Sequence, residues 1–487
     1  MGFPAQRIPI TVAQGGAHSL VTANGSGSSI SRNHLQASRS FKYPPQKGSV
    51  IVTSPVRRAG AFAGLCTLTL AVPFLGPTLT APIAAFVALV ALLTTDGPVF
   101  ELFAFPDDYA GGRLYGLFTF VLAVTTLGAL AVLGSLPLPI FVGAVLLVGY
   151  GAFAETIARA QTDVDILQTV VFCTVGTVAA LVGQAATRFV IEEPIDPALP
   201  LLVFLAVSGT LLAALLRDVL IAYDDPIVLL SVGLSMWLLY ELEPTIGLVG
   251  MAVALGITIA IGFVSHALGA ASIAGMLTGI LLALLTIVLG GYDWFALLIT
   301  FFGVGSLSTK FRYDEKATRG VAEANDGARG SSNVIGNTAA AMIAVIGYAA
   351  SAVDLLTVDP WLFTFAFAGA LSTALSDTLS SEIGSVYDEP RLITTFERVE
   401  PGTDGGVTWQ GELAGIAGAT AMAAVGFLVF PAIGLVGAAI IFASGFVGMT
   451  VDSLLGASLE GQYLDNQGVN FLATVAGALT GAGLFLL

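Results

Sequence analysis

The chain has 487 residues, of which 56% are hydrophobic and only 10% are charged, and its formal net charge is −15. Soluble domains carry roughly 25% charged residues, so this composition excludes an ordinary soluble protein. Apolar runs of about 20 residues recur along the chain, whereas the strands of a membrane β-barrel would alternate over about 10 residues. We therefore expect an all-α polytopic membrane protein with no nucleic-acid partner.

Few residue types suited to metal or nucleophile chemistry occur in the apolar part of the chain. Cys66 and Cys173 both lie within apolar runs, so neither a disulfide framework nor a zinc site is expected. His266 is the one histidine beyond the N-terminal region, which argues against Ser-His-Asp catalysis and against a multi-histidine metal site. The acidic excess lies in short loops and favours solvation at high salt, as in halophiles, over repulsion of anionic partners.

The chain divides by composition into three parts. Residues 1–55 are expected to be a disordered tail, because they lack a long apolar run and a signal-peptide core. The alternative is that translation starts near Val52. Residues 56–243 form an N-terminal transmembrane module with few polar groups, of which Glu155 and Gln184 are expected at helix ends or between helices. Residues 244–487 are richer in glycine and polar motifs, and we expect them to form the catalytic module.

About 15 transmembrane helices are expected, and the basic residues indicate their orientation. Arg57 and Arg58 precede the first helix and place the N-terminus in the cytoplasm. The loops that are then cytoplasmic contain the other basic residues of the membrane part, except Arg188, which falls in a loop on the outer side. Both long polar loops of the C-terminal module then face the cytoplasm. The expected helices cover residues 58–75, 79–95, 113–134, 137–157, 165–187, 198–222, 226–242, 244–265, 270–290, 292–309, 333–353, 361–379, 412–431, 433–450 and 468–486.

A basic, glycine-rich segment follows the helix that ends near residue 309. Five of the 11 basic residues after position 60 lie between residues 310 and 329. Such side chains suit phosphate oxygens, and a following helix would point its N-terminus at the same anion. An ordinary cytoplasmic loop would explain the charges, but not two asparagines four residues apart on one helix face. The expected phosphate ligands are Lys310, Lys316, Arg319, Arg329, Asn333 and Asn337; the P-loop pattern is absent.

A second polar cluster, SDTLSSEIG, ends the apolar helix expected at 361–379. Asp377 and Ser380 are three residues apart and therefore share a helix face. Hard oxygen ligands of this kind suit Mg²⁺, which proteins bind through one or two carboxylates plus substrate phosphates. Helix capping is the alternative, but an aspartate embedded in a membrane is more often functional. We expect Ser376 and Ser380 near the phosphates, and Asp377 and Glu382 near the metal.

Two further clusters complete the expected site. The loop PGTDGGVT contains Thr403, Asp404, Gly405 and Gly406, whose backbone amides can form an anion-binding nest, although such a sequence also makes a plain turn. The segment VDSLLGASLE places Asp452 at the end of another apolar helix. A second carboxylate there would let two acidic helices hold a nucleotide–metal unit. The alternative for Asp452 is a helix end that faces water.

Residues 244–487 resemble a membrane-protein family known as domain of unknown function 92, which includes transmembrane protein 19 and the plastid phytyl-phosphate kinase. The motifs that carry the resemblance are STK (308–310), GVAEANDGARG (320–330), NVIGN (333–337), SDTLSSEIG (376–384), PGTDGGVT (401–408) and VDSLLGASLE (451–460). The family tends toward Gly-Arg-Arg-Gly where this chain has Gly-Ala-Arg-Gly at 327–330. The chain is thus identified as an archaeal-type member with an N-terminal extension.

The resemblance implies a membrane enzyme that uses a nucleoside triphosphate, with CTP favoured, to phosphorylate an isoprenyl monophosphate of the phytyl or geranylgeranyl type. It implies that Asp377 and Asp452 hold Mg²⁺, that Lys310 and Arg329 bind phosphates, and that the GTDGG loop binds the nucleotide. The alternative is a transporter or lipid-translocating protein. That alternative predicts an inverted repeat and polar residues at the bilayer midplane, whereas the sequence has no convincing repeat and its polar residues gather at one membrane face.

Overall fold

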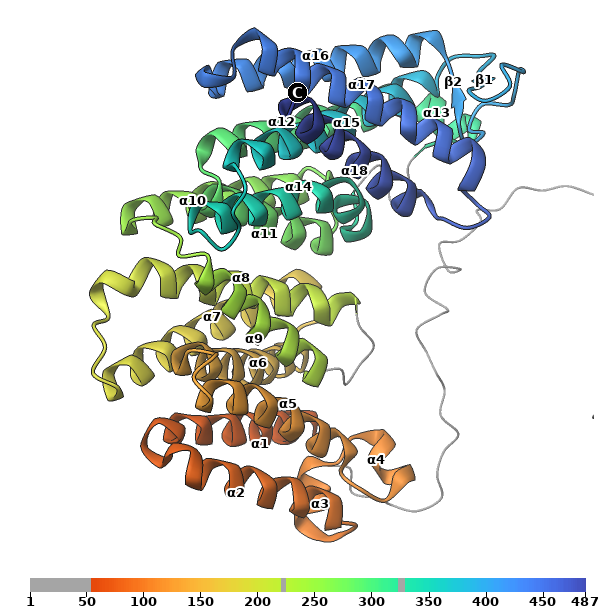
Figure 1. Ribbon diagram of the computed structural model, residues 1–487. Coiled ribbons are helices and arrows are strands. Elements are labelled where there is room, and N and C mark those ends of the chain that lie inside the picture. The colour runs from red at the N-terminus through yellow and green to blue at the C-terminus, as the bar shows by residue number, and fades with distance from the viewer. Residues whose placement is uncertain (1–53, 220–224, 323–328) are drawn as a thin grey trace, which may run out of the picture. The chain divides into compact units, whose positions relative to one another are not determined.

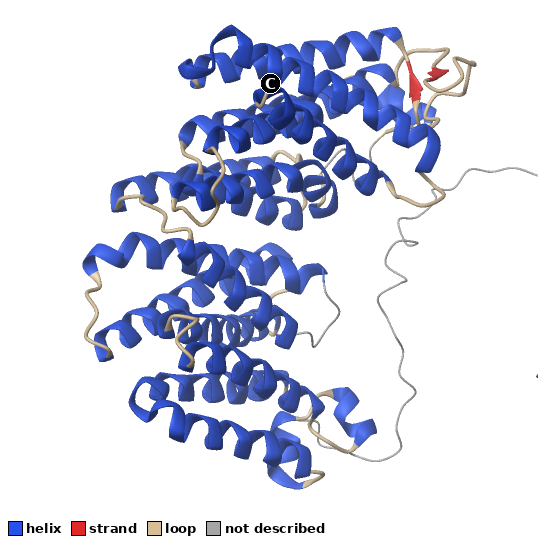
Figure 2. Ribbon diagram, viewed as in Figure 1, coloured by secondary structure: helices blue, strands red, loops and turns tan. Residues whose placement is uncertain are grey.

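A computed structural model describes residues 54–219, 225–322 and 329–487. These residues are almost entirely helical (Figures 1 and 2). Most of the expected tail, the alternative start at Val52 and part of the GVAEANDGARG motif lie outside the described residues. The helices are α1 Pro55–Thr67, α2 Val72–Leu93, α3 Gly97–Phe103, α4 Pro106–Gly111, α5 Tyr115–Val132, α6 Leu138–Arg159, α7 Asp165–Val190, α8 Leu199–Val219, α9 Asp225–Glu241, α10 Leu248–Ala267, α11 Ile273–Leu289, α12 Tyr292–Thr309, α13 Tyr313–Arg319, α14 Ser331–Ala352, α15 Pro360–Gly384, α16 Trp409–Val429, α17 Gly434–Leu459 and α18 Asn466–Phe485.

The all-α polytopic membrane fold is confirmed. Within the described ranges, 11 helical segments are long and apolar enough to cross a membrane, or up to 13 if each of two bent pairs is one span. One bent pair joins α12 to α13 at 63°, and α11 is an apolar helix shorter than these candidate spans. The expected count of about 15 is roughly consistent with this result.

The acidic loop at 106–112 is more ordered than its composition suggests. It forms α4, and the side chain of Asp108 is buried. The Asp108 carboxylate accepts hydrogen bonds of 2.9 Å from the backbone N–H groups of Phe105 and Tyr115. This aspartate therefore caps a helix and closes the loop, as a carboxylate at the third helical position does; it does not serve to hold water at the surface.

The two polar exceptions of the N-terminal helices both join neighbouring helices. Glu155, at the end of α6, is buried and forms a 3.1 Å ion pair with Arg217 of α8, which also pairs with Asp225 of α9. The Gln184 amide of α7 donates to the Leu202 carbonyl of α8 at 3.3 Å. These contacts pair the Glu155 carboxylate and the Gln184 amide nitrogen, which would otherwise be costly within a membrane, whereas the Gln184 Oε1 atom is buried without a partner among the described residues.

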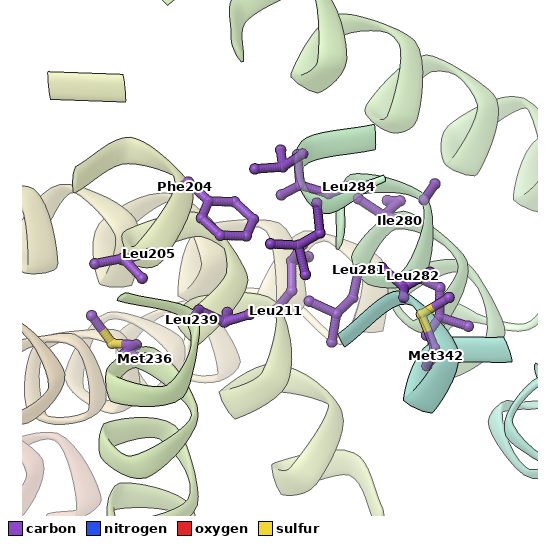
Figure 3. Packing of buried hydrophobic residues seen from close by; sticks show 14 of the residues in the cluster. Phe204, Leu205, Leu211, Met236, Leu239, Ile280, Leu281, Leu282, Leu284 and Met342 are labelled. Atoms are coloured by element: carbon purple, nitrogen blue, oxygen red, sulfur yellow. The ribbon is translucent and has the colours of Figure 1, made fainter. Parts of the chain in front are cut away.

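Apolar packing connects α8 and α9 to α11. Figure 3 shows Phe204 and Leu211 of α8 next to Leu281 and Leu284 of α11. All of these side chains are buried and belong to one hydrophobic cluster that continues into α14 and α15. Most of the described helices therefore contribute to one continuous core, whereas Phe100 of α3 belongs to a second, smaller cluster. Dispersion contacts provide the attraction within these clusters because lipid is as apolar as the side chains.

Helix α15 is the most enclosed of the candidate spans, and α14, α16, α17 and α18 pack around it. Glycines on the surrounding helices allow this close approach. A Cβ added to Gly418 of α16 would lie 3.1 Å from the Cα of Ser376, and one added to Gly448 of α17 would collide with the Thr373 hydroxyl. Small residues at helix crossings are the usual means of tight packing in membranes. The glycines thus bring α17 against the polar half of α15.

Replacing Gly448 by leucine is expected to destabilise the protein by about 1–3 kcal/mol, which is typical of overpacking. The Thr373 hydroxyl donates to the Ser444 carbonyl at 3.1 Å, so it cannot move aside without breaking that hydrogen bond. Thermal unfolding in detergent measures the effect. Gly483→Leu on α18 is the control, because a Cβ there meets no atom within 4 Å. Equal unfolding temperatures for the two variants would contradict the close α15–α17 packing.

Candidate active site

The polar clusters of the C-terminal helices gather at one end of those helices. In Figure 1, α13 and the strands β1 (Arg391–Leu392) and β2 (Gly406–Val407) lie at the same end, to the right. The α15–α16 connection returns through the antiparallel β1–β2 pair, in which Leu392 is opposite Gly406. This arrangement brings together segments that are up to 150 residues apart.

Asp377 of α15 and Asp452 of α17 meet at this end, where their carboxyl groups lie in hydrogen-bonding contact. Both side chains are partly buried, and Ser376 beside them is fully buried. Among the described residues, the Oδ1 atom of Asp452 is buried without a hydrogen-bond partner. Two carboxylates in contact repel each other, so the pair requires a proton or a cation between its oxygens.

The donor set of this pair fits Mg²⁺ that arrives with a substrate. Within the described ranges, no group of three or more His, Cys, Asp or Glu side chains is arranged to hold a metal ion. Mg²⁺ commonly binds through one or two carboxylates plus substrate phosphates and water, and the Asp377–Asp452 pair supplies those two carboxylates.

Lys316 and Glu382 form a buried ion pair between α13 and the end of α15. The Lys316 ammonium also donates to the backbone carbonyls of Thr309, at 2.7 Å, and Ser308, at 3.4 Å. An ammonium group has three donors, so these three acceptors engage all of them. Lys316, expected as a phosphate ligand, therefore joins α12, α13 and α15, and Glu382, expected as a metal ligand, is its partner.

Arg329 and Lys310 both contact the connection between α10 and α11. The Arg329 guanidinium is buried above the Phe301 ring, 5.1 Å from its centroid, and beside Gly305 of α12. The Arg329 backbone N–H donates to the Ala270 carbonyl at 3.0 Å. Lys310 is exposed, and its ammonium donates to the Leu268 carbonyl at 2.9 Å. The Lys310 ammonium and the Arg329 backbone therefore both contact the α10–α11 connection, and the Arg329 guanidinium packs against α12.

The other expected phosphate ligands have mainly local contacts. Arg319 pairs with Asp388 at 2.9 Å and with Glu315 at 3.2 Å. The buried Asn337 amide donates to the Asn333 carbonyl at 3.0 Å, within α14. The first turn of α16 packs closely against Ser380 of α15, as the position of Gly411 shows. A Cβ added to Gly411 would lie 2.7 Å from the Ser380 carbonyl oxygen. None of these contacts within the described residues joins the side chains to the Asp377–Asp452 pair.

The GTDGG loop lies against the end of α17. Gly405 has a φ of 72° and contacts Ala457 so closely that a Cβ there would lie 2.5 Å from the Ala457 Cβ. Glycine is thus required both by the backbone angle and by the packing. The Thr403 hydroxyl donates to the Glu400 carbonyl at 2.7 Å, and Gly406 begins β2. The loop is therefore held one to two turns beyond Asp452 along α17.

A shallow, open depression of about 380 Å³ lies between this loop and the α17–α18 connection. It is lined by Asp404, Glu460, Asp465 and the residues from 461 to 466. Partial burial, together with the negative charges of Asp404, Asp377 and Asp465, raises the pKa of Glu460. Sequence reasoning did not identify residues 461–465, although VDSLLGASLE ends at Glu460, immediately before them. An acidic depression here suits the metal-bound face of a nucleotide better than a bare phosphate.

Replacing Glu460 by glutamine is expected to stabilise the metal-free protein at neutral pH. The pKa of Glu460 is raised by folding, so its contribution to stability is present below the unfolded pKa and is lost as the pH rises through the folded pKa. The gain should disappear as the pH falls toward about 4.3, the ordinary value for glutamate. Thermal unfolding across this range tests the effect. Glu397 is exposed and serves as the control. If Glu397→Gln stabilises the protein as much as Glu460→Gln does, the gain in stability comes from the change in net charge alone.

Comparisons with known proteins find matches within this chain. Residues 256–478 match the family described as integral membrane protein DUF92. An uncharacterised membrane protein of Synechocystis is 33% identical over 202 residues, which are 40% of this chain and 74% of that protein. An uncharacterised membrane protein of Methanocaldococcus jannaschii is 34% identical over 201 residues, 40% of this chain and 77% of its own length.

A plant protein is also similar. The chloroplastic protein VTE6 of Arabidopsis thaliana is 32% identical over 219 residues, which are 43% of this chain and 63% of VTE6. No solved structure has a significant match. The matched residues include α15 and α17 with their aspartates, and the chain belongs to the DUF92 family of integral membrane proteins.

Proposed function

We propose that this protein is a membrane-embedded kinase that transfers the terminal phosphoryl group of a nucleoside triphosphate to an isoprenyl monophosphate, giving the diphosphate. The observation that carries the proposal is the contact between Asp377 and Asp452, a carboxyl pair joined from two tightly packed membrane helices. The family that this chain resembles includes the plastid phytyl-phosphate kinase, and this resemblance supports an isoprenyl monophosphate as the acceptor. CTP is the nucleotide that this resemblance favours.

The proposed chemistry needs little beyond positioning and charge neutralisation. A phosphate oxygen of the acceptor attacks the terminal phosphorus, the bond to the bridging oxygen breaks, and the nucleoside diphosphate leaves with that oxygen. The acceptor is already an anion, so no general base is required. Mg²⁺, held by Asp377 and Asp452 together with nucleotide phosphates, would neutralise the charge on those phosphates.

The remaining residues have positioning roles in this proposal. Arg329 is a fixed, bidentate donor for the acceptor phosphate, and the exposed Lys310 adds a point charge at the α10–α11 connection. The GTDGG loop offers backbone amides to the nucleotide. Lys316 and Glu382 hold α13 against α12 and α15. The positive-inside rule orients this end toward the cytoplasm, where nucleotides are available.

The test uses purified full-length protein in lipid nanodiscs with Mg²⁺. Each of CTP, ATP, GTP and UTP, labelled in its terminal phosphate, is incubated with phytyl phosphate or geranylgeranyl phosphate, and lipid products are separated by chromatography. We expect labelled isoprenyl diphosphate with at least one nucleotide, and no product when a chelator removes Mg²⁺. Folded protein that forms no diphosphate from any pair of substrates would overturn the proposal.

A further inference from the structure

A cavity of about 600 Å³ lies among the N-terminal helices, which the family match at residues 256–478 does not include. Its described lining comes from α1, α5, α6, α8 and α9 and from Phe105, just before α4. Along α6 the lining runs from Val148 to Ala160, which is about 18 Å at the helical rise of 1.5 Å per residue. The cavity therefore follows the second half of α6 to the end of that helix.

The polarity of this lining changes from one end to the other. On α6 it changes from Val148 and Ala152 to Arg159 in the last turn. On α1 Arg58 lies in the first turn, and Phe62 follows one turn later. The two helices are antiparallel, because the start of α1 contacts the last two turns of α6 and the end of α1 contacts its middle. The cavity is thus cationic at one end and apolar at the other.

Phenylalanine rings form a wall between these two ends. The centroid of the Phe62 ring lies 5.5 Å from the centroids of both the Phe105 and the Phe120 rings. The Arg58 guanidinium lies over the Phe105 ring, 4.7 Å from its centroid. The wall that begins at the cationic end is therefore an apolar surface, with which a hydrocarbon chain makes favourable dispersion contacts.

The cationic end is lined by three arginines from three helices: Arg58, Arg159 and Arg217. They are half of the six basic residues between positions 56 and 243, in a chain whose net charge is −15. The Glu155 carboxylate pairs with Arg159 at 2.6 Å and with Arg217 at 3.1 Å. Asp225 pairs with Arg217 as well. The two carboxylates thus have two of the three arginines as partners.

Joining α6, α8 and α9 does not require all three cations. Arg217 alone pairs with both carboxylates, so a purely structural network would be complete with that arginine. The described partners of Arg58 are neutral, namely the Ala104 carbonyl at 3.1 Å and the Phe105 ring. Among the described residues, three guanidinium groups therefore face two carboxylates, and each guanidinium has five N–H donors. An anion at this end would compensate the remaining positive charge.

We infer that this cavity binds a lipid with an anionic phosphate head. The phosphate lies at Arg58 and Arg159, and the first part of the hydrocarbon chain lies along Phe62 and Ala152. Guanidinium binds phosphate oxygens in a planar, bidentate manner, and basic pockets between membrane helices bind anionic lipid heads. A zwitterionic head brings no net charge and would leave the excess positive charge uncompensated. The site is separate from the aspartate pair of α15 and α17, so the inference does not rest on the proposed kinase function.

The experiment uses full-length protein in phosphatidylcholine nanodiscs that contain a minor fraction of phosphatidylglycerol with a photoreactive diazirine in its acyl chain. Mass spectrometry of the wild type is expected to locate the label on α1, α5 and α6. Arg58→Gln should lower this labelling about tenfold, as expected for the loss of one charged hydrogen-bond donor. Arg159→Gln should have a similar effect, and Glu155 keeps Arg217 as its partner in that variant. Arg57→Gln is the matched control, because Arg57 is adjacent, exposed and absent from the cavity lining, and its substitution removes the same charge.

A second pair of variants tests the apolar end of the cavity. Ala152→Leu places a larger side chain in the space assigned to the hydrocarbon chain, and it should lower the labelling while all three arginines remain. Ala154→Leu is its control, because Ala154 lies on the same helix, is partly buried as Ala152 is, and does not line the cavity. If the arginine variants do not fold, this pair decides, and equal labelling of the two would overturn the inference.

Three other results would contradict the lipid site. The first is folded Arg58→Gln and Arg159→Gln, with wild-type unfolding temperatures, that are labelled as strongly as Arg57→Gln. The second is equal labelling of these helices by phosphatidylcholine that carries the same diazirine, which would mean that the cavity holds bulk lipid. The third is loss of the label when inorganic phosphate is added, which would mean that the site binds free phosphate. Diphosphate formation is not a readout of these experiments, so a failure of the kinase proposal leaves this inference unaffected.

Discussion

Replacing Asp377 by asparagine is expected to lower the rate of diphosphate formation by about 10²–10³-fold, the effect typical of removing one preorganised electrostatic group from an active site. The asparagine has nearly the same shape, but it removes one of the two carboxylates that meet between α15 and α17. The Mg²⁺ concentration needed for half-maximal rate should rise as well. Initial rates with labelled nucleotide, measured across a Mg²⁺ titration, give both quantities.

The control for this variant lies on the same helix. Asp359 caps the opposite end of α15, where its carboxylate accepts a 2.9 Å hydrogen bond from the Trp361 N–H. Asp359→Asn keeps a good capping residue and should leave the rate unchanged. If both variants retain the wild-type rate while the wild type is active, the carboxyl pair is not the metal site. Asp452→Asn should reproduce the loss caused by Asp377→Asn.

Replacing Lys316 by methionine is expected to destabilise the protein by roughly 3–5 kcal/mol, the largest effect on stability that we expect from a single substitution. The Lys316 side chain is fully buried and its ammonium contacts Glu382, Ser308 and Thr309. Removing it leaves the Glu382 carboxylate buried without its cation. Unfolding in detergent, followed by circular dichroism, measures the loss.

The double variant Lys316→Met with Glu382→Leu tests the physical reason. Breaking a buried pair from one side is costly because of the charge that remains, whereas replacing both partners by apolar residues is often nearly neutral. We therefore expect the double variant to be more stable than Lys316→Met alone. Additive losses would instead mean that the two side chains act independently. Breaking the exposed ion pair between Arg398 and Glu389 is the surface comparison, and it should change the free energy of unfolding little.

Local sequence is sufficient to predict the membrane class and to single out the apolar helices that contain carboxylates. Runs of apolar residues give the spans directly, and an aspartate in such a run stands out because it is costly there. Asp377 and Asp452 were therefore identified one by one. Their contact was not derivable from spacing, since it depends on how closely α17 approaches α15 through glycines such as Gly448. The proposal that Asp377 and Asp452 share a metal ion rests on the order of the motifs that carry the family resemblance.

The partners of the basic residues could not be read from the chain. Lys316 reaches Glu382, 66 residues away, because the α12–α13 bend turns α13 toward the end of α15. The Arg329 guanidinium lies over Phe301 of α12, and its backbone pairs with Ala271 in the α10–α11 connection. Both arrangements are tertiary, and a basic loop that follows the positive-inside rule would have the same sequence pattern.

The enclosure of α15 also has a consequence for how the protein is made. This helix is the least apolar of the candidate spans and the most buried, and three of the helices that surround it, α16 to α18, are synthesised after it. Lipid is a poor solvent for Asp377 and its neighbouring hydroxyls. A nascent chain that ends before Trp409 therefore lacks three of the helices that cover α15, and the carboxyl pair can form only after α17, which carries Asp452, has been synthesised.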